Sequence, residues 1–235
     1  MEFPKVENPT QMNPSKSESE KRDDKRRTVI AERRLEIDKI VDAEGKGIDE
    51  EIKNPIIALN IADLPTKASC QGHYGEDEGG MGAPWIEIAA KNEPEERFNN
   101  QNEIFQKVAE KYKMPLEETK RSFNPDAYWE AMKEASQQGE TTEYQEWDKK
   151  NQELFEKAQN LLDEFYKDRK VDDSLKLQLE EGVSGFRVHN GGDDYKDLEG
   201  NISEEEQEAL KKRLELYQGE MKEFANFLVR KFLKF

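Results

Sequence analysis

The chain has 235 residues and a net charge of −16, and 38% of its residues are charged against 34% that are hydrophobic. Soluble domains typically carry about 25% charged residues, so this chain has little core material and much solvated surface. The acidity disfavours binding to nucleic acid backbones or to anionic lipid, because either partner needs a basic surface. We therefore expect thin layers of helices and strands around a modest core.

One stretch, residues 21–34, has the opposite charge, with seven Lys or Arg and three acidic residues. A short run of mixed sign is a weak footprint for nucleic acid. It favours an intramolecular contact with the acidic body, or a solvated helix start, over an RNA-contacting arm.

The location of the protein is indicated by what the sequence lacks. Its single cysteine cannot form an internal disulfide, so nothing indicates an oxidising compartment. It has no apolar run of about 18 residues, the length of a membrane-spanning helix. Its first residues lack the apolar core of a signal peptide. We expect a soluble, cytoplasmic protein with no membrane partner.

Residues 1–26 predict a disordered tail, because three prolines lie among Ser, Lys and Glu with little apolar material between them. Residues 27–235 predict a single domain. It begins with a helix over 28–44, followed by a second helix that Asp49 can cap and that stops before Pro65.

Four short segments have the composition and alternation of strands, namely 66–70, 84–90, 174–180 and 185–190. Between the first two, the glycine-rich segment 72–82 predicts a mobile loop. Neither predicted hairpin is stable alone in water. We therefore expect one mixed or antiparallel sheet of four strands with helices covering one face, which is a helix-rich α+β fold.

Clear start signals mark the predicted helices between and after the hairpins. Three short ones open at Pro94, Pro115 and Asn124-Pro125, and two long ones cover 142–170 and 203–235. Both long helices carry apolar residues spaced by three and four, so we expect them to pack against each other and extend away as a pair. Wide apolar stripes are more often core than interface, which favours a monomer over a homodimer.

The richest chemistry lies in the turn from Cys70 to His73, which holds the only cysteine and one of two histidines. A thiolate and an imidazole three residues apart can converge on one point. They suit zinc, and they are also the parts of a cysteine nucleophile with its base. Gly72 lets the backbone turn sharply and form an anion-binding nest. The alternative is a structural turn with Cys70 as a small buried hydrophobe.

The other histidine, His189, ends a predicted strand in the second hairpin. If the hairpins share a sheet in suitable order, Cys70, His73 and His189 meet as zinc ligands, with Glu87 as a further carboxylate. Trp85 follows the glycine-rich segment 72–82 and is a further candidate binding residue, because Cys, His, Gly and Trp are concentrated in this part of the chain. Arg187 either recognises an anion or pairs with one of the many carboxylates.

The turn resembles a family of uncharacterised bacterial proteins that share a P-T-x-x-S-C-x-G-H turn followed by A-P-W. The matching residues are Leu64-Pro65-Thr66, Ser69-Cys70-Gln71-Gly72-His73 and Ala83-Pro84-Trp85, with further likeness in 92–98 and in Tyr195-Lys196. The likeness runs from about Arg26 to the C-terminus, and it implies no catalytic roles.

Ser69, Cys70 and Gly72 are also similar to the Ser-Cys-Ser-Gly-Arg turn of the wybutosine-synthesis methyltransferase family. Gln71 and His73 differ from that turn, and the likeness implies a strand–turn–strand geometry only.

Two functional hypotheses follow. In the first, the Cys70–His73 turn binds a small molecule, an anion or a metal such as zinc, and the protein is a small enzyme or a binding protein. The alternative is a non-enzymatic protein–protein interaction module that uses its acidic amphipathic helices.

Overall fold

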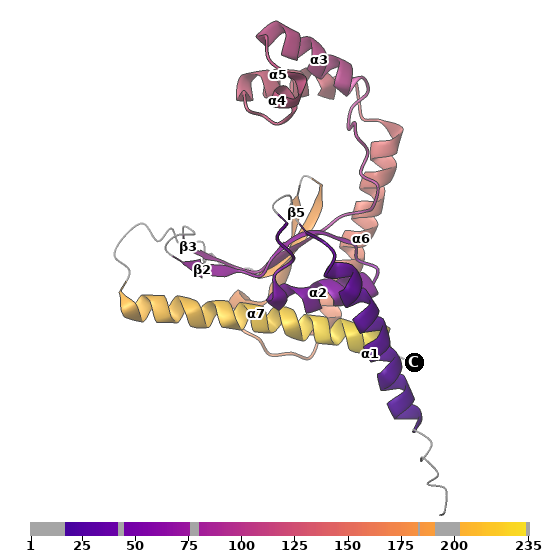
Figure 1. Ribbon diagram of the computed structural model, residues 1–235, viewed down its shortest axis with the longest axis vertical. Coiled ribbons are helices and arrows are strands. Elements are labelled where there is room, and N and C mark those ends of the chain that lie inside the picture. The colour runs from indigo at the N-terminus through magenta and orange to yellow at the C-terminus, as the bar shows by residue number, and fades with distance from the viewer. Residues whose placement is uncertain (1–16, 42–44, 76–79, 183, 191–202, 234–235) are drawn as a thin grey trace, which may run out of the picture.

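The structure is a computed structural model that describes residues 17–41, 45–75, 80–182, 184–190 and 203–233. These residues form seven α-helices, a four-stranded sheet and a separate two-stranded hairpin (Figure 1). The predicted helix-rich α+β fold is confirmed. None of the helices in these ranges is both long enough and apolar enough to cross a bilayer.

The main sheet contains β1 (Thr66–Cys70), β4 (Trp85–Ile88), β6 (Gly185–Asn190) and β5 (Leu177–Gly182), in that spatial order. Every neighbouring pair is antiparallel, so the mixed alternative does not apply. The four predicted strands are confirmed with small shifts at their ends. The largest shift is in β5, which starts three residues late because residues 173–175 form a turn of 3-10 helix.

The segment 72–82, predicted to be a mobile loop, contains a second hairpin. Here β2 (His73–Gly75) pairs with β3 (Gly80–Gly82), and residues 76–79 lie outside the described residues. Met81, which is 1% exposed, packs with Tyr217 and Leu210 of the last helix. The Met81 side chain therefore attaches β3, at the end of this glycine-rich segment, to the last helix.

The two faces of the main sheet have different roles. Ile86, Ile88, Phe186 and Val188 alternate along β4 and β6 and are buried. They share one core with α2 (Glu50–Ile61), α6 (Thr142–Tyr166) and α7 (Glu204–Phe232). The residues between them lie on the opposite, more exposed face, because successive side chains of a strand point to opposite sides.

The first helix, α1 (Glu18–Ile37), corrects the predicted N-terminal boundary. Ser17 and Glu20 form a capping box, so residues 18–26, predicted to belong to a disordered tail, are helical. The helix also ends at Ile37 and not at the predicted 44. Residues 1–16, the remainder of the predicted tail, lie outside the described residues.

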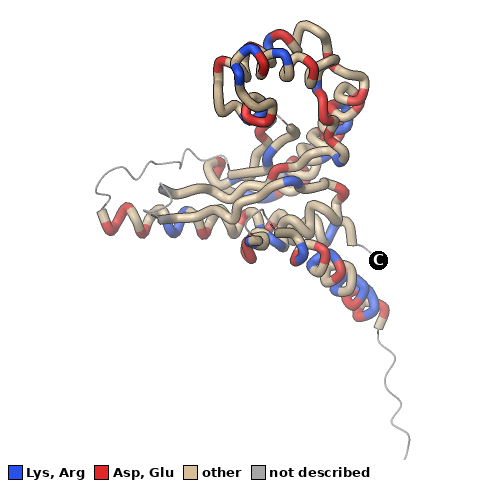
Figure 2. The backbone as a smooth tube through the Cα atoms, turned by 45° about the horizontal axis from the view of Figure 1, so that its top comes forward, with Lys and Arg blue, Asp and Glu red and all other residues tan. Residues whose placement is uncertain are grey.

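The basic stretch 21–34 lies on α1, where acidic and basic positions are interleaved (Figure 2). Arg34 pairs with Glu50 of α2, and Arg26 donates from Nε to the carbonyl oxygen of Leu233. Both contacts are intramolecular, in line with the favoured interpretation of this stretch.

The last helix corrects the predicted pairing of the two long helices. α7 packs along α2 below the sheet, whereas α6 meets it only near its own C-terminal end (Figure 1). There the Phe165 ring lies 5.2 Å from the Phe224 ring, and Arg169 donates to Glu220 at 2.8 Å. The predicted contact between the two long helices is therefore present but confined to this end, and the main partner of α7 is α2.

Three short helices, α3 (Gln101–Tyr112), α4 (Leu116–Lys120) and α5 (Pro125–Ser136), form a unit at the far end of α6 (Figure 1). They share their own core, separate from that of the sheet. Its members are Phe98, Ile104, Phe105, Val108, Ala127, Ala131 and Ala135. The single domain predicted for residues 27–235 stays a prediction.

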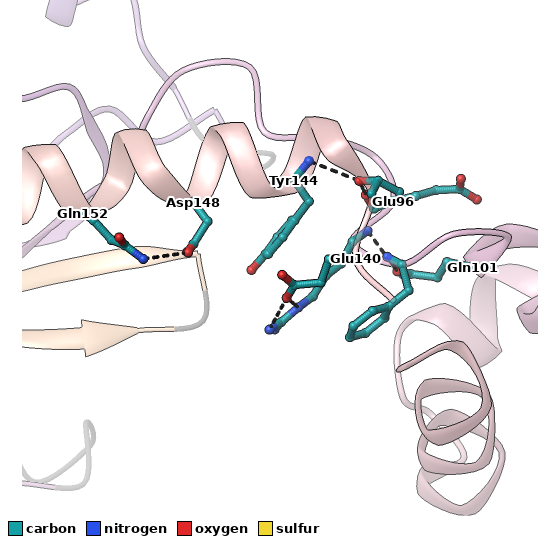
Figure 3. Close-up of polar contacts among 9 residues, drawn as sticks. Glu96, Gln101, Glu140, Tyr144, Asp148 and Gln152 are labelled. Atoms are coloured by element: carbon teal, nitrogen blue, oxygen red, sulfur yellow. Dashed lines mark hydrogen bonds and ion pairs between the residues drawn. The ribbon is translucent and has the colours of Figure 1, made fainter. Parts of the chain in front are cut away.

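The joint between this unit and α6 is held by polar contacts (Figure 3). Arg97 donates to Glu140 at 2.9 Å and lies over the ring of Tyr144. The backbone N–H of Thr141 donates to the Arg97 carbonyl at 2.9 Å, and its hydroxyl donates to the Glu96 carbonyl. The start of α6 is thus fixed to the chain segment that leads into α3.

One carboxylate in the helical unit gives a prediction about pH. Glu130 of α5 accepts hydrogen bonds from Lys111 Nζ at 2.7 Å and from the Tyr112 hydroxyl at 3.0 Å. The bond from Lys111, followed by that from Tyr112, holds the pKa of Glu130 below its ordinary value. Its stabilising contribution is therefore present above the unfolded pKa of about 4.3, and it is lost as pH falls through the folded pKa.

We expect Lys111→Met to raise the pKa of Glu130 in an NMR titration, because the main cause of the depression is removed. Lys107→Met removes a positive charge from the same helix and should leave that pKa in place. An equal change in both variants would mean that general charge, and not the hydrogen bond, sets the pKa.

Candidate functional site

The Cys70–His73 turn joins the two sheets. Cys70 is the last residue of β1 in the main sheet, and His73 is the first residue of β2 in the small hairpin. Gly72 has φ +79°, in the left-handed region. A Cβ there would lie 2.8 Å from the Gly82 oxygen and 3.0 Å from the Pro84 nitrogen. Only glycine therefore fits this position without movement of the neighbouring backbone.

The turn brings its two reactive side chains together. Cys70 Sγ lies 3.7 Å from His73 Nδ1, within hydrogen-bond range for sulfur. The Gly72 backbone N–H donates to the same sulfur, with a distance of 3.4 Å between nitrogen and sulfur. The imidazole is therefore placed to take the thiol proton, with a backbone donor beside the same sulfur.

Two other elements hold the turn in place. Gln218 of α7 donates from its side-chain amide to the Gln71 carbonyl at 3.0 Å. Gly82 of β3 lies against the His73 ring, so that a Cβ on Gly82 would be 2.8 Å from Cε1. The absence of a side chain at position 82 therefore leaves room for the His73 ring beside β3.

The remaining predicted site residues lie on the exposed face of the main sheet. Cys70 pairs with Trp85, and Trp85 pairs with His189, so the three form one row across β1, β4 and β6. Directly paired residues in antiparallel strands share a face. Glu87 and Arg187 pair with each other in a neighbouring row on that face. Trp85 thus separates Cys70 from His189.

Arg187 and His189 both have partners within the sheet. The Arg187 guanidinium lies 4.3 Å from the centre of the Trp85 ring and 3.6 Å from Glu87 Oε2. His189 Nδ1 lies 2.9 Å from the Asn190 carbonyl oxygen, and Nε2 lies 3.6 Å from Glu180 Oε2. Arg187 therefore pairs with a carboxylate, that of Glu87, which was the alternative to its recognising an anion.

The predicted zinc site is not assembled. Within the described ranges, no group of three or more His, Cys, Asp or Glu side chains converges where a metal ion could be held. The physical reason is the strand order, which inserts β4 and its Trp85 between Cys70 and His189. Zinc needs its ligands about 2.0 to 2.3 Å from one centre. Cys70 and His73 remain as a pair, without His189 or Glu87.

Sequence reasoning missed the residues that support the pair. Gly82 and Gln218 hold His73 and the turn, and Glu180 faces His189. The G-M-G sequence at 80–82 was a usable signal, because a buried methionine between glycines favours a short strand with close backbone approach. Gln218 offered no signal, since its role depends on how α7 lies under the turn.

Comparisons with models of known families, with curated proteins and with solved structures found no match to this chain. The resemblance of the turn to bacterial proteins with the P-T-x-x-S-C-x-G-H pattern therefore stays a prediction. Any function assigned to the chain rests on the geometry of its own residues.

Proposed function

We propose that the chain binds a small electrophilic ligand at the Cys70–His73 turn and acts on it through the Cys70 thiolate, as a small enzyme. The observation that carries this proposal is the placement of His73 Nδ1 and the Gly72 N–H around one sulfur, at 3.7 and 3.4 Å. His73 accepts the thiol proton as Sγ bonds to an acyl carbon of the ligand, the bond from that carbon to the leaving group breaks, and the imidazolium gives its proton to the leaving group. Water, deprotonated by His73, then attacks the thioester carbon, which releases the acid and returns Sγ to its starting state.

The surroundings of the pair favour a ligand with an anionic group. Trp85 offers a partly exposed aromatic surface beside Cys70, and the Arg187 guanidinium lies over that ring. Arg187 is 44% exposed, and its ion pair with Glu87 is long at 3.6 Å. A carboxylate or phosphate on the ligand can therefore approach the guanidinium from solvent.

The single cysteine makes the test specific, since alkylation by iodoacetamide reports on Cys70 alone. At pH 7 we expect His73→Gln to slow alkylation by about tenfold or more, because the thiolate is the reactive form and the variant loses its proton acceptor. Lys67→Gln changes charge on the same strand without touching the turn, and it should react like wild type.

The urea-unfolded chain provides a reference for an unassisted thiol. Equal rates for the folded wild type, the His73→Gln variant and the unfolded chain would contradict the proposal. Cys70 would then be a structural residue of the turn.

The second candidate function is binding of a partner protein through the three-helix unit. It is favoured by two aromatic side chains of this unit, Phe123 and Trp129, which are 70% and 66% exposed. Cross-linking in cell extract should capture a partner with wild type and lose it with the double variant Phe123→Ser, Trp129→Ser. The same cross-linked species in both samples would count against this function.

A further inference from the structure

A cleft of about 540 Å³ lies between α6 and the tip of the β5–β6 hairpin, away from the Cys70–His73 turn. One wall is formed by α6 residues from Trp147 to Glu156, and the other by Glu181, Gly182, Gly185 and Phe186. A volume of about 300 to 1,000 Å³ is usual for sites that bind small molecules. The cleft is therefore large enough for one such ligand.

The charge of the cleft has one sign. Asp148, Glu156 and Glu181 line it, and none of the described residues that line it is Lys or Arg. Asp148 is held by a hydrogen bond from Gln152 Nε2 at 2.9 Å, and both side chains lie on the side of α6 that faces the strands (Figure 3). Carboxylates gathered without a cation raise the local concentration of positively charged ligands.

The floor of the cleft is apolar. The Phe155 ring packs edge-on against the Phe186 ring, with 5.2 Å between their centres. Aromatic faces beside carboxylates suit an organic cation, whose carbon atoms need an apolar surface while its charge needs an anion.

Asn151 supplies an independent observation. Its side chain is 6% exposed and lines the cleft. Its Oδ1 accepts from the Ala90 backbone N–H at 2.7 Å, which fixes the orientation of the amide because only the oxygen can accept. Its Nδ2 is buried without a partner among the described residues. Buried donors nearly always have an acceptor, so this group points to one that a ligand supplies.

We propose that this cleft binds a small organic cation that also carries a carbonyl oxygen. Asp148, Glu156 and Glu181 oppose its charge, the partly buried Phe155 ring contacts its carbon atoms, and Asn151 Nδ2 donates to its oxygen. This site is separate from the Cys70–His73 turn and does not depend on the function proposed there.

Three probes of similar size separate these contributions. Argininamide has both the guanidinium and the carbonyl oxygen, agmatine keeps the guanidinium but lacks the carbonyl, and citrullinamide keeps the carbonyl but has a neutral ureido group. Binding can be followed by NMR through the indole N–H of Trp147, which lines the cleft and donates to the Ala90 carbonyl. Trp129, in the distant helical unit, is the internal reference.

We expect argininamide to shift the Trp147 signal in a saturable manner while the Trp129 signal stays in place. Agmatine should bind about fivefold more weakly, because Asn151 Nδ2 stays unsatisfied. Citrullinamide should bind about tenfold more weakly, because a neutral ureido group replaces the guanidinium and only the α-ammonium remains to face the carboxylates. The ligand series tests Asn151 without a core substitution, which would also change the packing of α6.

Matched variants test the carboxylates. Asp148→Asn and Glu156→Gln should each weaken argininamide binding about three- to tenfold. Glu146→Gln makes the same change of charge on the same helix, but Glu146 does not line the cleft, so the affinity should stay within about twofold of wild type.

The proposal is overturned if argininamide gives no saturable shift, or if citrullinamide binds as tightly as argininamide. It is also overturned if Glu146→Gln weakens binding as much as Asp148→Asn, since attraction would then come from the net charge of the protein. Neither result bears on the alkylation of Cys70, so the two proposals can fail separately.

Discussion

The substitution Gly185→Ala is expected to destabilise the fold by about 4 kcal/mol or more. Gly185 starts β6 with φ +136°, a conformation that L side chains rarely adopt. A Cβ there would overlap the Ile88 carbonyl oxygen and lie 3.0 Å from the Ala89 side chain. Because the nearest atom belongs to the backbone of β4, relief requires the two central strands to separate.

Gly182→Ala is the matched control, since Gly182 pairs with Gly185 across the same hairpin. The nearest atom to its Cβ would be the Gly185 oxygen at 3.5 Å, which is ordinary van der Waals contact. We expect a cost below about 1 kcal/mol in urea unfolding. Equal midpoints for the two variants would show that β4 and β6 do not approach as closely as described.

Phe224→Ala is expected to cost about 3 to 5 kcal/mol, the usual range for removing a buried phenylalanine. Phe224 of α7 is 2% exposed and belongs to the core shared by the sheet, α2 and α6. Its ring lies 5.2 Å from that of Phe165 and stacks with Phe227 at 6.2 Å. The variant leaves a cavity where three helices meet, so the urea midpoint should fall sharply.

Phe123→Ala removes the same side chain from a surface position that is 70% exposed. Its unfolding free energy should stay within about 0.5 kcal/mol of wild type. If Phe224→Ala behaves like Phe123→Ala, then the contact of α7 with α6 does not contribute to the main core.

The strands were predictable because apolar residues occupy every second position along them. Ile86 with Ile88, and Phe186 with Val188, specify one buried face each, and a shift of one residue would expose them. The start of α7 was predictable from the capping pair Ser203 and Glu206.

The start of α1 was missed although Ser17 and Glu20 form the same motif. Residues 18–28 contain no apolar side chain, so the apolar face that predicted the rest of this helix is absent from its first turns. The contact of α7 with α6 was predicted to be more extensive than it is, for a related reason. An apolar stripe shows that a helix face is buried, but its spacing does not say against which element.

The close approach of Cys70 and His73 follows from their spacing, because a turn of two residues suffices to bring them together. The position of His189 depends on the spatial order of the strands, which alternation does not specify. The cleft beside α6 was not predictable from the sequence either. Asn151 occupies a position in an apolar stripe, and the pattern does not show what its amide contacts. Its Nδ2 is seen to lack a partner only when the structure places the Ala90 N–H against Oδ1.

The strand order also has a consequence for how the chain folds. β4 and β6 are the central pair, and Ile86 pairs with Val188, about a hundred residues further along, so this contact closes a long loop. The helices α3, α4 and α5 need only neighbours in sequence. During synthesis they can form first, whereas β4 must wait for β6 with one edge unpaired, and for α7 to complete the cover of its apolar side. The interval before β6 emerges is therefore when this chain is most prone to aggregate.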